Sequence, residues 1–247
     1  MTTLAFRTAT LSHTGGRPIN EDACGYRNGC WVVADGLGGH GGGEVASRLA
    51  VDSLLQQADL PLPMDAAGLI QALAAAEQAI HHQQKTDSRL SQMRTTLVLL
   101  CSDGHNALWA HIGDSRLYHL RDGRIHFQTR DHSVPQAIAD AGEIAPAEIR
   151  FHEDRNRLLR SLGNDKAQRP TLAEALLPLR AGDVFLLCTD GFWEYVTEAE
   201  MEVTLAKAAS PGQWLQSMAF VLLRRATAVH DNYTALAVFV DPWSPEP

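Results

Sequence analysis

The stretch WVVADGLGGHGGGEVAS, from Trp31 to Ser47, joins a short apolar run to a segment with helical spacing through a loop rich in glycine. Three interpretations of this loop are open: a cradle for phosphate, a metal site, or a flexible linker. The loop lacks the Gly-Lys-Ser/Thr ending of a phosphate-binding loop, and its Gly-x-Gly spacing is weak evidence for dinucleotide binding. The choice between a metal site and a linker depends on what the rest of the chain brings to Asp35.

Helical and strand-like segments surround this loop in a regular order. Apolar residues recur at helical spacing in 43–57, and the alanine-rich segment 66–85 is amphipathic. Two more helices are expected at 197–209 and 211–229. Short apolar runs bounded by turn residues predict strands at 3–10, 24–26, 30–35, 95–102, 106–113, 115–120, 124–129, 184–190 and 233–240.

Turn sequences link several of these strands into hairpins. Asn28-Gly29, Asp103-Gly104 and Asp122-Gly123 each stand between two apolar runs. The order of strands, two helices, strands, two helices and a last strand predicts helices packed on the outside of antiparallel sheets. A doubly wound parallel sheet fits this order poorly.

Composition narrows the class of protein. The 247 residues show no break in composition, so one domain over 1–247 is expected. The net charge of -8 argues against bulk attraction to nucleic acid or to an anionic membrane. The N-terminus does not resemble a signal peptide, and no apolar run is long enough to span a membrane, so we expect a cytoplasmic chain without membrane insertion. The four cysteines lack metal-site spacing and are expected to be buried thiols.

Four aspartates stand at the ends of apolar runs that are expected to be core strands. Asp35, Asp114 and Asp190 follow such runs, and Asp231 precedes one. If these ends meet at one edge of the sheets, the like charges need a cation to stay ionised, and oxygen ligands suit Mg²⁺ or Mn²⁺. The alternative is that each aspartate is only a turn residue, because Asp-Gly and Asp-Asn are common turn dipeptides.

A second polar cluster lies near the N-terminus. The sequence RPINED places Arg17 close to Glu21 and Asp22. The planar guanidinium group of arginine suits bidentate binding of phosphate. The alternative for this cluster is a solvated group of surface charges.

Taken in order, the motifs of the chain resemble those of the protein phosphatase 2C family of metal-dependent protein phosphatases, and specifically its compact bacterial branch. The resemblance covers about residues 7–240 and is carried by RPINED, VADGLGGHGGGEVAS, HIGDSRLYHLRDG, RDHSVPQAIADAGEI, RNRLLRSLG, FLLCTDGFWEYV and HDNYTALAV. It implies an α+β fold, a four-layer α-β-β-α sandwich of two antiparallel sheets flanked by antiparallel helix pairs. It also implies a flap segment at about 131–160, and 242–247 is expected to be a loose tail.

The resemblance implies a site for two Mn²⁺ or Mg²⁺ ions and for a third, weaker ion. Asp35 would bridge the two core ions, and Gly36 would give its backbone carbonyl to one of them. Asp190 and Asp231 would complete the other core ion, and Asp114 would hold the third ion together with Asp190.

The resemblance also implies catalytic roles near these ligands. Arg17 would bind the phosphate, while Glu21 and Asp22 would act through metal-bound waters and hydrogen bonds. His40 matches the signature histidine of the loop. Some relatives have a histidine directly after the Asp-Gly pair, where this chain has Leu37. The leaving oxygen would therefore take its proton from His40 or from a metal-bound water, and we favour the water.

The activity implied is hydrolysis of phosphoserine and phosphothreonine in proteins by direct attack of a water that bridges the metals. The implied partners are a phosphorylated protein and a cognate Ser/Thr kinase, and we expect a monomer. Two alternatives stay open: a phosphoprotein-binding regulator with little turnover, and a phosphomonoesterase for small molecules. The chain departs from the family pattern at Arg94, where glycine is common, and at Glu194, where aspartate is usual.

Overall fold

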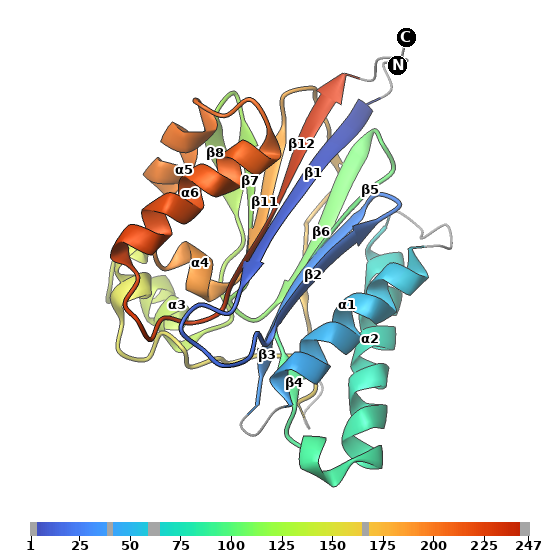
Figure 1. Ribbon diagram of the computed structural model, residues 1–247. Helices are drawn as coiled ribbons and strands as arrows, with labels where there is room; N and C mark the ends of the chain where they lie inside the picture. Colours follow the sequence, from blue (N-terminus) through green and yellow to red (C-terminus); the bar gives the residue numbers. More distant parts are fainter. Residues whose placement is uncertain (1–3, 39–41, 59–64, 165–167, 243–247) are drawn as a thin grey trace.

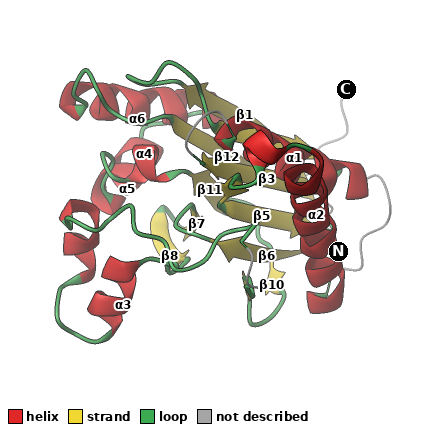
Figure 2. Ribbon diagram, turned by 90° about the horizontal axis from the view of Figure 1, so that it is seen from below, coloured by secondary structure: helices red, strands yellow, loops and turns green. Residues whose placement is uncertain are grey.

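The computed structural model describes residues 4–38, 42–58, 65–164 and 168–242. Two sheets lie face to face, and helices cover the outer surface of each sheet (Figure 1; Figure 2). The predicted four-layer α-β-β-α arrangement is therefore confirmed. The proposed loose tail lies almost wholly outside the described residues, since Pro242 ends the last strand.

One sheet, here called the β12 sheet, has the antiparallel order β1-β12-β11-β7-β8. Its strands are Leu4–His13 (β1), Tyr233–Pro242 (β12), Val184–Cys188 (β11), Arg116–Arg121 (β7) and Arg124–Gln128 (β8). The predicted turn between β7 and β8 is present, with a positive φ of 52° at Asp122 and 73° at Gly123.

The other sheet, here called the β3 sheet, has the order β10-β6-β5-β3-β2 and is also antiparallel. Its main strands are Asp22–Arg27 (β2), Cys30–Leu37 (β3), Leu97–Ser102 (β5) and Asn106–Ile112 (β6). Three two-residue strands join it: Arg94–Thr95 (β4), Thr171–Leu172 (β9) and Leu177–Pro178 (β10). The sequence did not predict these three, because two residues are too few to show an alternating pattern.

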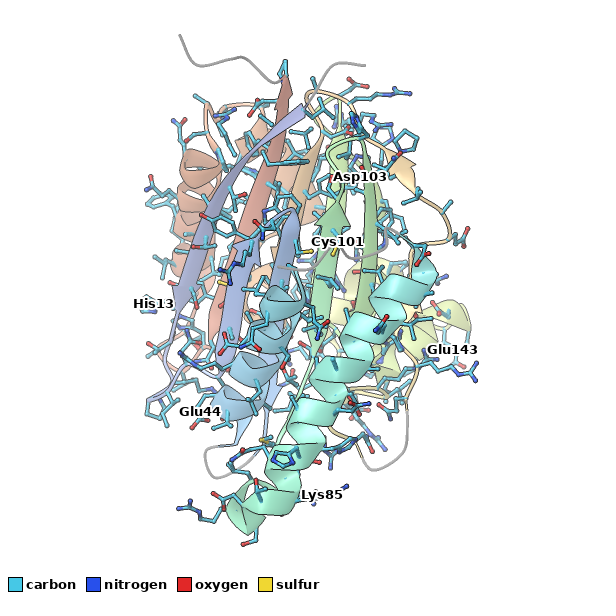
Figure 3. The ribbon with its side chains drawn as sticks, turned by 90° about the vertical axis from the view of Figure 1, so that its right-hand side faces the viewer. His13, Glu44, Lys85, Cys101, Asp103 and Glu143 are labelled. Carbon is cyan, nitrogen blue, oxygen red and sulfur yellow. The ribbon has the colours of Figure 1, made fainter. Side chains whose placement is uncertain are left out.

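Helices cover both sheets. The helices Gly43–Gln57 (α1) and Ala66–Thr86 (α2) run in opposite directions across the outer face of the β3 sheet (Figure 1; Figure 3). The other side carries Asp190–Trp193 (α4), Glu198–Leu205 (α5) and Pro211–Arg225 (α6). The predicted flap contains Val134–Asp140 (α3) and the 3₁₀ turn Pro146–Phe151 (η2), and a second 3₁₀ turn, Ser88–Leu90 (η1), follows α2.

Helix α6 ends four residues before the predicted end at Val229. After Arg225 the chain turns toward the edge of the β12 sheet, where the N–H of Gly16 donates to the carbonyl of His230 at 2.9 Å. The predicted helix was too long because the apolar spacing after Arg225 gives no sign of this turn.

The core has three layers, and strand alternation explains them. In β3, Trp31 and Val33 pack between the two sheets, while Val32 and Ala34 face α1 and α2. Strand β12 alternates in the same way, with Leu236 between the sheets. Every second residue of a central strand is therefore buried on each face, which positions the strand ends rigidly.

Two further observations concern the described part of the chain. No helix there has the length and apolar character needed to cross a bilayer. The four cysteines are free thiols; Cys24 is half-buried, and Cys30, Cys101 and Cys188 are buried.

Candidate metal centre

A cavity of about 330 Å³ opens where the strand ends of the two sheets meet. It is lined by seven of the predicted site residues: Arg17, Glu21, Asp35, Gly36, Asp114, Asp190 and Asp231. Asp22 does not line the cavity but lies directly opposite Asp35 in the β2–β3 ladder. His40 lies outside the described residues.

Asp35 is held by the strand that follows α2. Strand β3 does not end at Asp35, as predicted, but continues to Leu37 because β4 pairs with its last two residues. The backbone N–H of Asp35 donates to the hydroxyl of Thr96 at 3.0 Å, and its carbonyl accepts from the hydroxyl of Thr95 at 2.8 Å. These contacts fix the backbone of Asp35 on both sides.

Asp190 is the first residue of α4 and not the last residue of a strand, so that detail of the prediction was wrong. The strand stops at Cys188 because the N–H groups of Phe192 and Trp193 donate to the carbonyl of Thr189, which starts a helical turn. Apolar spacing alone does not reveal this turn.

Gly191 brings Asp190 next to Asp231. A Cβ atom at Gly191 would lie 2.0 Å from the carbonyl oxygen of Asn232, so only glycine permits this contact of two backbones. The first turn of α4 therefore packs directly on the segment that leads into β12.

Asp114 occupies the turn between β6 and β7 and is buried. Gly113 precedes it with a φ of +100°, and a Cβ there would lie 2.6 Å from the side chain of Thr96. The indole N–H of Trp193 donates to the carbonyl of Asp114 at 2.9 Å. The turn is thus tied to α4.

Burial and repulsion between like charges raise the pKa values of these carboxylates. Burial, followed by the charge of Asp190, raises the pKa of Asp35 and of Asp114 well above the usual range. Burial and then Asp231 raise the pKa of Asp190 to about 6. The raised pKa values follow from like charges gathered in a buried place, and a bound cation would favour the ionised carboxylates.

The donor set suits a hard cation. In the described ranges, no three acidic, histidine or cysteine side chains close around one point as a complete metal cage. Mg²⁺ takes only one or two carboxylates and keeps several waters, so such a cage is not required. Asp35, Asp190, Asp231 and the backbone of Gly36 supply oxygen atoms without a soft ligand at the same cavity. These residues fit Mn²⁺ or Mg²⁺.

Asp22 and Glu21 support this group from the end of β2. The hydroxyl of Thr189 donates to Oδ2 of Asp22 at 2.9 Å, while the buried Oδ1 has no hydrogen-bond partner among the described residues. Burial raises the pKa of Asp22 to about 7. The pKa of Glu21 is raised by burial and by Glu44.

Sequence reasoning missed the part played by Asn232. Its amide group accepts from the N–H of Glu21 at 2.8 Å and donates to the carbonyls of Thr14 (2.8 Å) and Ile19 (2.9 Å). These hydrogen bonds connect the segment between β1 and β2, which carries Arg17, to the start of β12. The Asp-Asn dipeptide was visible in the sequence, but it indicated only a turn.

The flap also contributes to the cavity. Asn156 and Leu158 line it, and sequence reasoning assigned neither a role. The flap residue Arg155 lies 2.9 Å from Glu194, whose pKa is raised to about 7 by burial and then by Asp190. Glu194 does not line the cavity, so its carboxylate serves this ion pair with the flap.

The comparisons with known proteins agree with this geometry. A family model described as "Protein phosphatase 2C" matches residues 11–228. The serine/threonine protein phosphatase PstP of Mycobacterium tuberculosis is 38% identical over 204 residues, which cover 79% of this chain. The serine/threonine phosphatase stp of Listeria innocua is 34% identical over 224 residues, which cover 84% of this chain. The match spans 82% of the Listeria protein but only 38% of the mycobacterial one.

Solved structures lead to the same family. The crystal structure of M. tuberculosis PstP superposes with a TM-score of 0.86 at 33% identity, covering 96% of this chain and 99% of that one. The PstP catalytic domain in complex with two manganese ions gives a TM-score of 0.85 at 33% identity, covering 97% of this chain and 100% of that one. The chain belongs to the protein phosphatase 2C family.

Proposed function

We propose that this chain is a Mn²⁺- or Mg²⁺-dependent phosphatase that hydrolyses phosphoserine and phosphothreonine in proteins. The observation that carries the proposal is the convergence of carboxylates from both sheets, with Arg17, on one cavity. The names of the relatives support the activity, and the two manganese ions of the PstP domain support the cofactor.

Under this proposal, Asp35 would be a ligand of both core ions, and Gly36 would offer its carbonyl to one of them. Asp190 and Asp231 would hold the other core ion, and Asp114 would hold a third ion together with Asp190. The converging side chains at the cavity support this assignment. When bound, the ions supply an activated water and positive charge near the phosphoryl oxygens.

The remaining chemistry belongs to the chain itself. Arg17 is partly exposed at the cavity and binds a phosphoryl oxygen. Glu21 would accept hydrogen bonds from water in the cavity, while Asp22, which does not line it, would support Asp35 from the neighbouring strand. Leu37 lines the cavity where a histidine would be a candidate acid, and no described lining residue is a histidine. His40 lies outside the described residues and stays the alternative donor, and we propose water as the donor of the proton to the leaving oxygen.

The flap favours a protein substrate over a small phosphomonoester. Asn156 and Leu158 form one wall of the cavity, so a substrate must lie against the flap as well as against the sheets. A cognate kinase, a monomeric state and a cytoplasmic location remain predictions from the sequence.

A phosphate-release assay tests the proposal. Purified protein should release phosphate from a phosphothreonine peptide with Mn²⁺ and stop when a chelator is added. Asp190→Asn should reduce the rate by at least about a hundredfold, because loss of a metal ligand costs more than loss of a group that only orients a ligand. Asp103→Asn, in the turn at the far end of the β3 sheet (Figure 3), is the matched control.

Two outcomes would contradict parts of the proposal. Full activity in chelator would refute the metal mechanism. Tight binding of phosphopeptides with no phosphate release would favour the phosphoprotein-binding alternative.

A further inference from the structure

A second cavity of about 440 Å³ lies beside the candidate metal centre. Leu37, Gly38, Asn156 and Leu158 line both cavities, so the two are neighbours across a shared wall. A substrate bound at the metal centre would therefore extend along this wall.

The two cavities differ in charge. Glu21, Asp35, Asp114, Asp190 and Asp231 make the first strongly acidic. Three arginines line the second, Arg94, Arg157 and Arg160, and no described lining residue there is an aspartate or glutamate. This concentration of positive charge stands out in a chain of net charge -8.

Two of the three arginines have no carboxylate partner among the residues that the structure describes. Arg94 donates to the side-chain oxygen of Gln92 at 3.2 Å, and Arg160 donates to the carbonyl of Arg169 at 3.2 Å. Within the described ranges, neither guanidinium forms an ion pair, whereas Arg157 lies 4.0 Å from Asp154. Each guanidinium has five N–H donors, so most donors of Arg94 and Arg160 remain available to a ligand.

The backbone fixes the position of Arg94. Strand β4 pairs with β3 so that Arg94 lies opposite Leu37, next to Gly36 of the metal centre. Arg94 stands where the family often has glycine. The pairing of β4 with β3 therefore holds this positive charge in place. A glycine at position 94 would supply no side chain and no charge.

We propose that this arginine-lined cavity binds a second anionic side chain of the substrate, a carboxylate or a phosphate near the phosphorylated residue. The inference rests on the proposed phosphatase function and names its substrate class, acidic or multiply phosphorylated segments. Arg94 is a specificity residue in this assignment. It binds the neighbouring anion and takes no part in the hydrolysis.

The test uses matched phosphothreonine peptides with wild-type protein and Mn²⁺. One set has neutral neighbours. In a second set, a single glutamate stands at each position in turn, from three before to three after the phosphothreonine. In a third set, a single phosphoserine is placed at the same positions. At the best position, an anionic peptide should show a kcat/KM about tenfold higher than the neutral peptide, mainly through KM, as for one charge-assisted hydrogen bond. Comparison of the glutamate and phosphoserine sets tells whether carboxylate or phosphate is the preferred anion.

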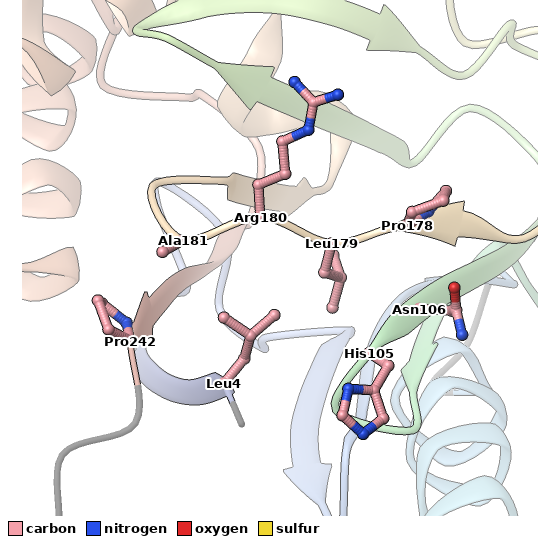
Figure 4. A pocket seen from close by; sticks show the side chains of 8 residues that line it. All are labelled: Leu4, His105, Asn106, Pro178, Leu179, Arg180, Ala181 and Pro242. Carbon is pink, nitrogen blue, oxygen red and sulfur yellow. The ribbon is translucent and has the colours of Figure 1, made fainter. Parts of the chain in front are cut away.

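The variants are chosen to separate charge from shape. Arg94→Gln should abolish the preference for the anionic peptide and leave the neutral peptide within about twofold of wild type. Arg180→Gln is the control, because Arg180 lines a cavity at the other end of the sandwich, beside Leu4 and Pro242 (Figure 4). It should keep the full preference.

The proposal fails if wild type shows no preference at any position, or if Arg94→Gln slows all peptides equally. Fluorescence anisotropy with the same peptides separates this failure from that of the phosphatase assignment. Binding of the anionic peptide that depends on Arg94, without phosphate release from any peptide, would support the cavity and refute the phosphatase. Phosphate release without any preference for anionic peptides would support the phosphatase and refute the proposed role of the arginine-lined cavity.

Discussion

The Nη2 atom of Arg17 lies 2.9 Å from Oδ2 of Asp231, so the residue proposed to bind phosphate is paired with a residue proposed to bind metal. Both side chains are partly exposed, at 53% and 40%. Solvent screening at this exposure keeps the pair weak, and the guanidinium can leave it for a phosphoryl oxygen at little cost.

Arg17→Gln should raise the KM for a phosphothreonine peptide about tenfold, because one charge-assisted contact to phosphate is lost. It should not weaken Mn²⁺ binding, since removal of a positive charge beside Asp231 favours a cation there. Steady-state kinetics and isothermal titration with Mn²⁺ check the two halves. A variant with normal KM but weakened Mn²⁺ binding would show that Arg17 serves the metal ligand and not the substrate.

Asn232→Ala should reduce Mn²⁺ affinity and activity by about ten- to a hundredfold, as expected for a group that orients ligands. The change leaves the N–H of Glu21 and the carbonyls of Thr14 and Ile19 without their partner. Mn²⁺ titration and phosphate release measure the effect. Asn106→Ala, at the start of β6 at the far end of the β3 sheet, is the control. Equal, small losses in both variants would contradict the role of Asn232.

Gly191→Ala should destabilise the fold by about 1–3 kcal/mol and weaken metal binding together, because the new Cβ collides with the carbonyl of Asn232. Gly212→Ala in α6 is the control, because its Cβ would meet nothing closer than 3.9 Å. Urea unfolding and Mn²⁺ titration give the two readings. Unchanged metal affinity in a destabilised Gly191→Ala protein would show that α4 does not set the position of Asp190.

Asp183→Asn should lower stability at neutral pH by about 3 kcal/mol, because it breaks a buried ion pair. The carboxylate of Asp183 accepts from Nε and Nη2 of Arg121 at 2.7 and 2.8 Å and from the N–H of Arg180 at 2.8 Å. Burial alone would raise the pKa of Asp183, but these hydrogen bonds outweigh it and lower the pKa.

The pH dependence of this variant follows from that direction. A lowered pKa in the folded state gives stability that is complete above the unfolded pKa of about 3.9 and is lost as the pH falls below it. The difference between wild type and Asp183→Asn should therefore be constant near neutral pH and shrink in acid. Urea unfolding in chelator at several pH values checks it, with Asp52→Asn, at an exposed position of α1, as control. A difference that grows in acid would refute the assignment.

The sequence predicted most of the architecture because its long elements carry clear periodicity. Helix α1 spans the predicted residues, and the hairpin turns at Asn28-Gly29 and Asp122-Gly123 occur where turn chemistry placed them. The short strands β4, β9 and β10 were not predictable, because tertiary pairing creates them.

The site was predicted as a set of residues but not as a geometry. Four separated aspartates indicated a cation, and the structure brings Asp35, Asp114, Asp190 and Asp231 to one cavity. The start of α4 at Asp190 and the three hydrogen bonds of Asn232 depend on contacts between segments far apart in the chain. Local patterns do not record such contacts.

The placement of the carboxylates on two sheets has a consequence for the newborn chain. Asp22 and Asp35 come from the β3 sheet, while Asp190 and Asp231 flank strands of the β12 sheet. Among the described elements, β12 comes last in the sequence, yet it pairs with β1, which comes first. During synthesis, the acidic cavity cannot assemble until β12 has left the ribosome and inserted between β1 and β11. In a partly made chain, the proposed metal site would therefore stay incomplete until residues 233–242 have been synthesised.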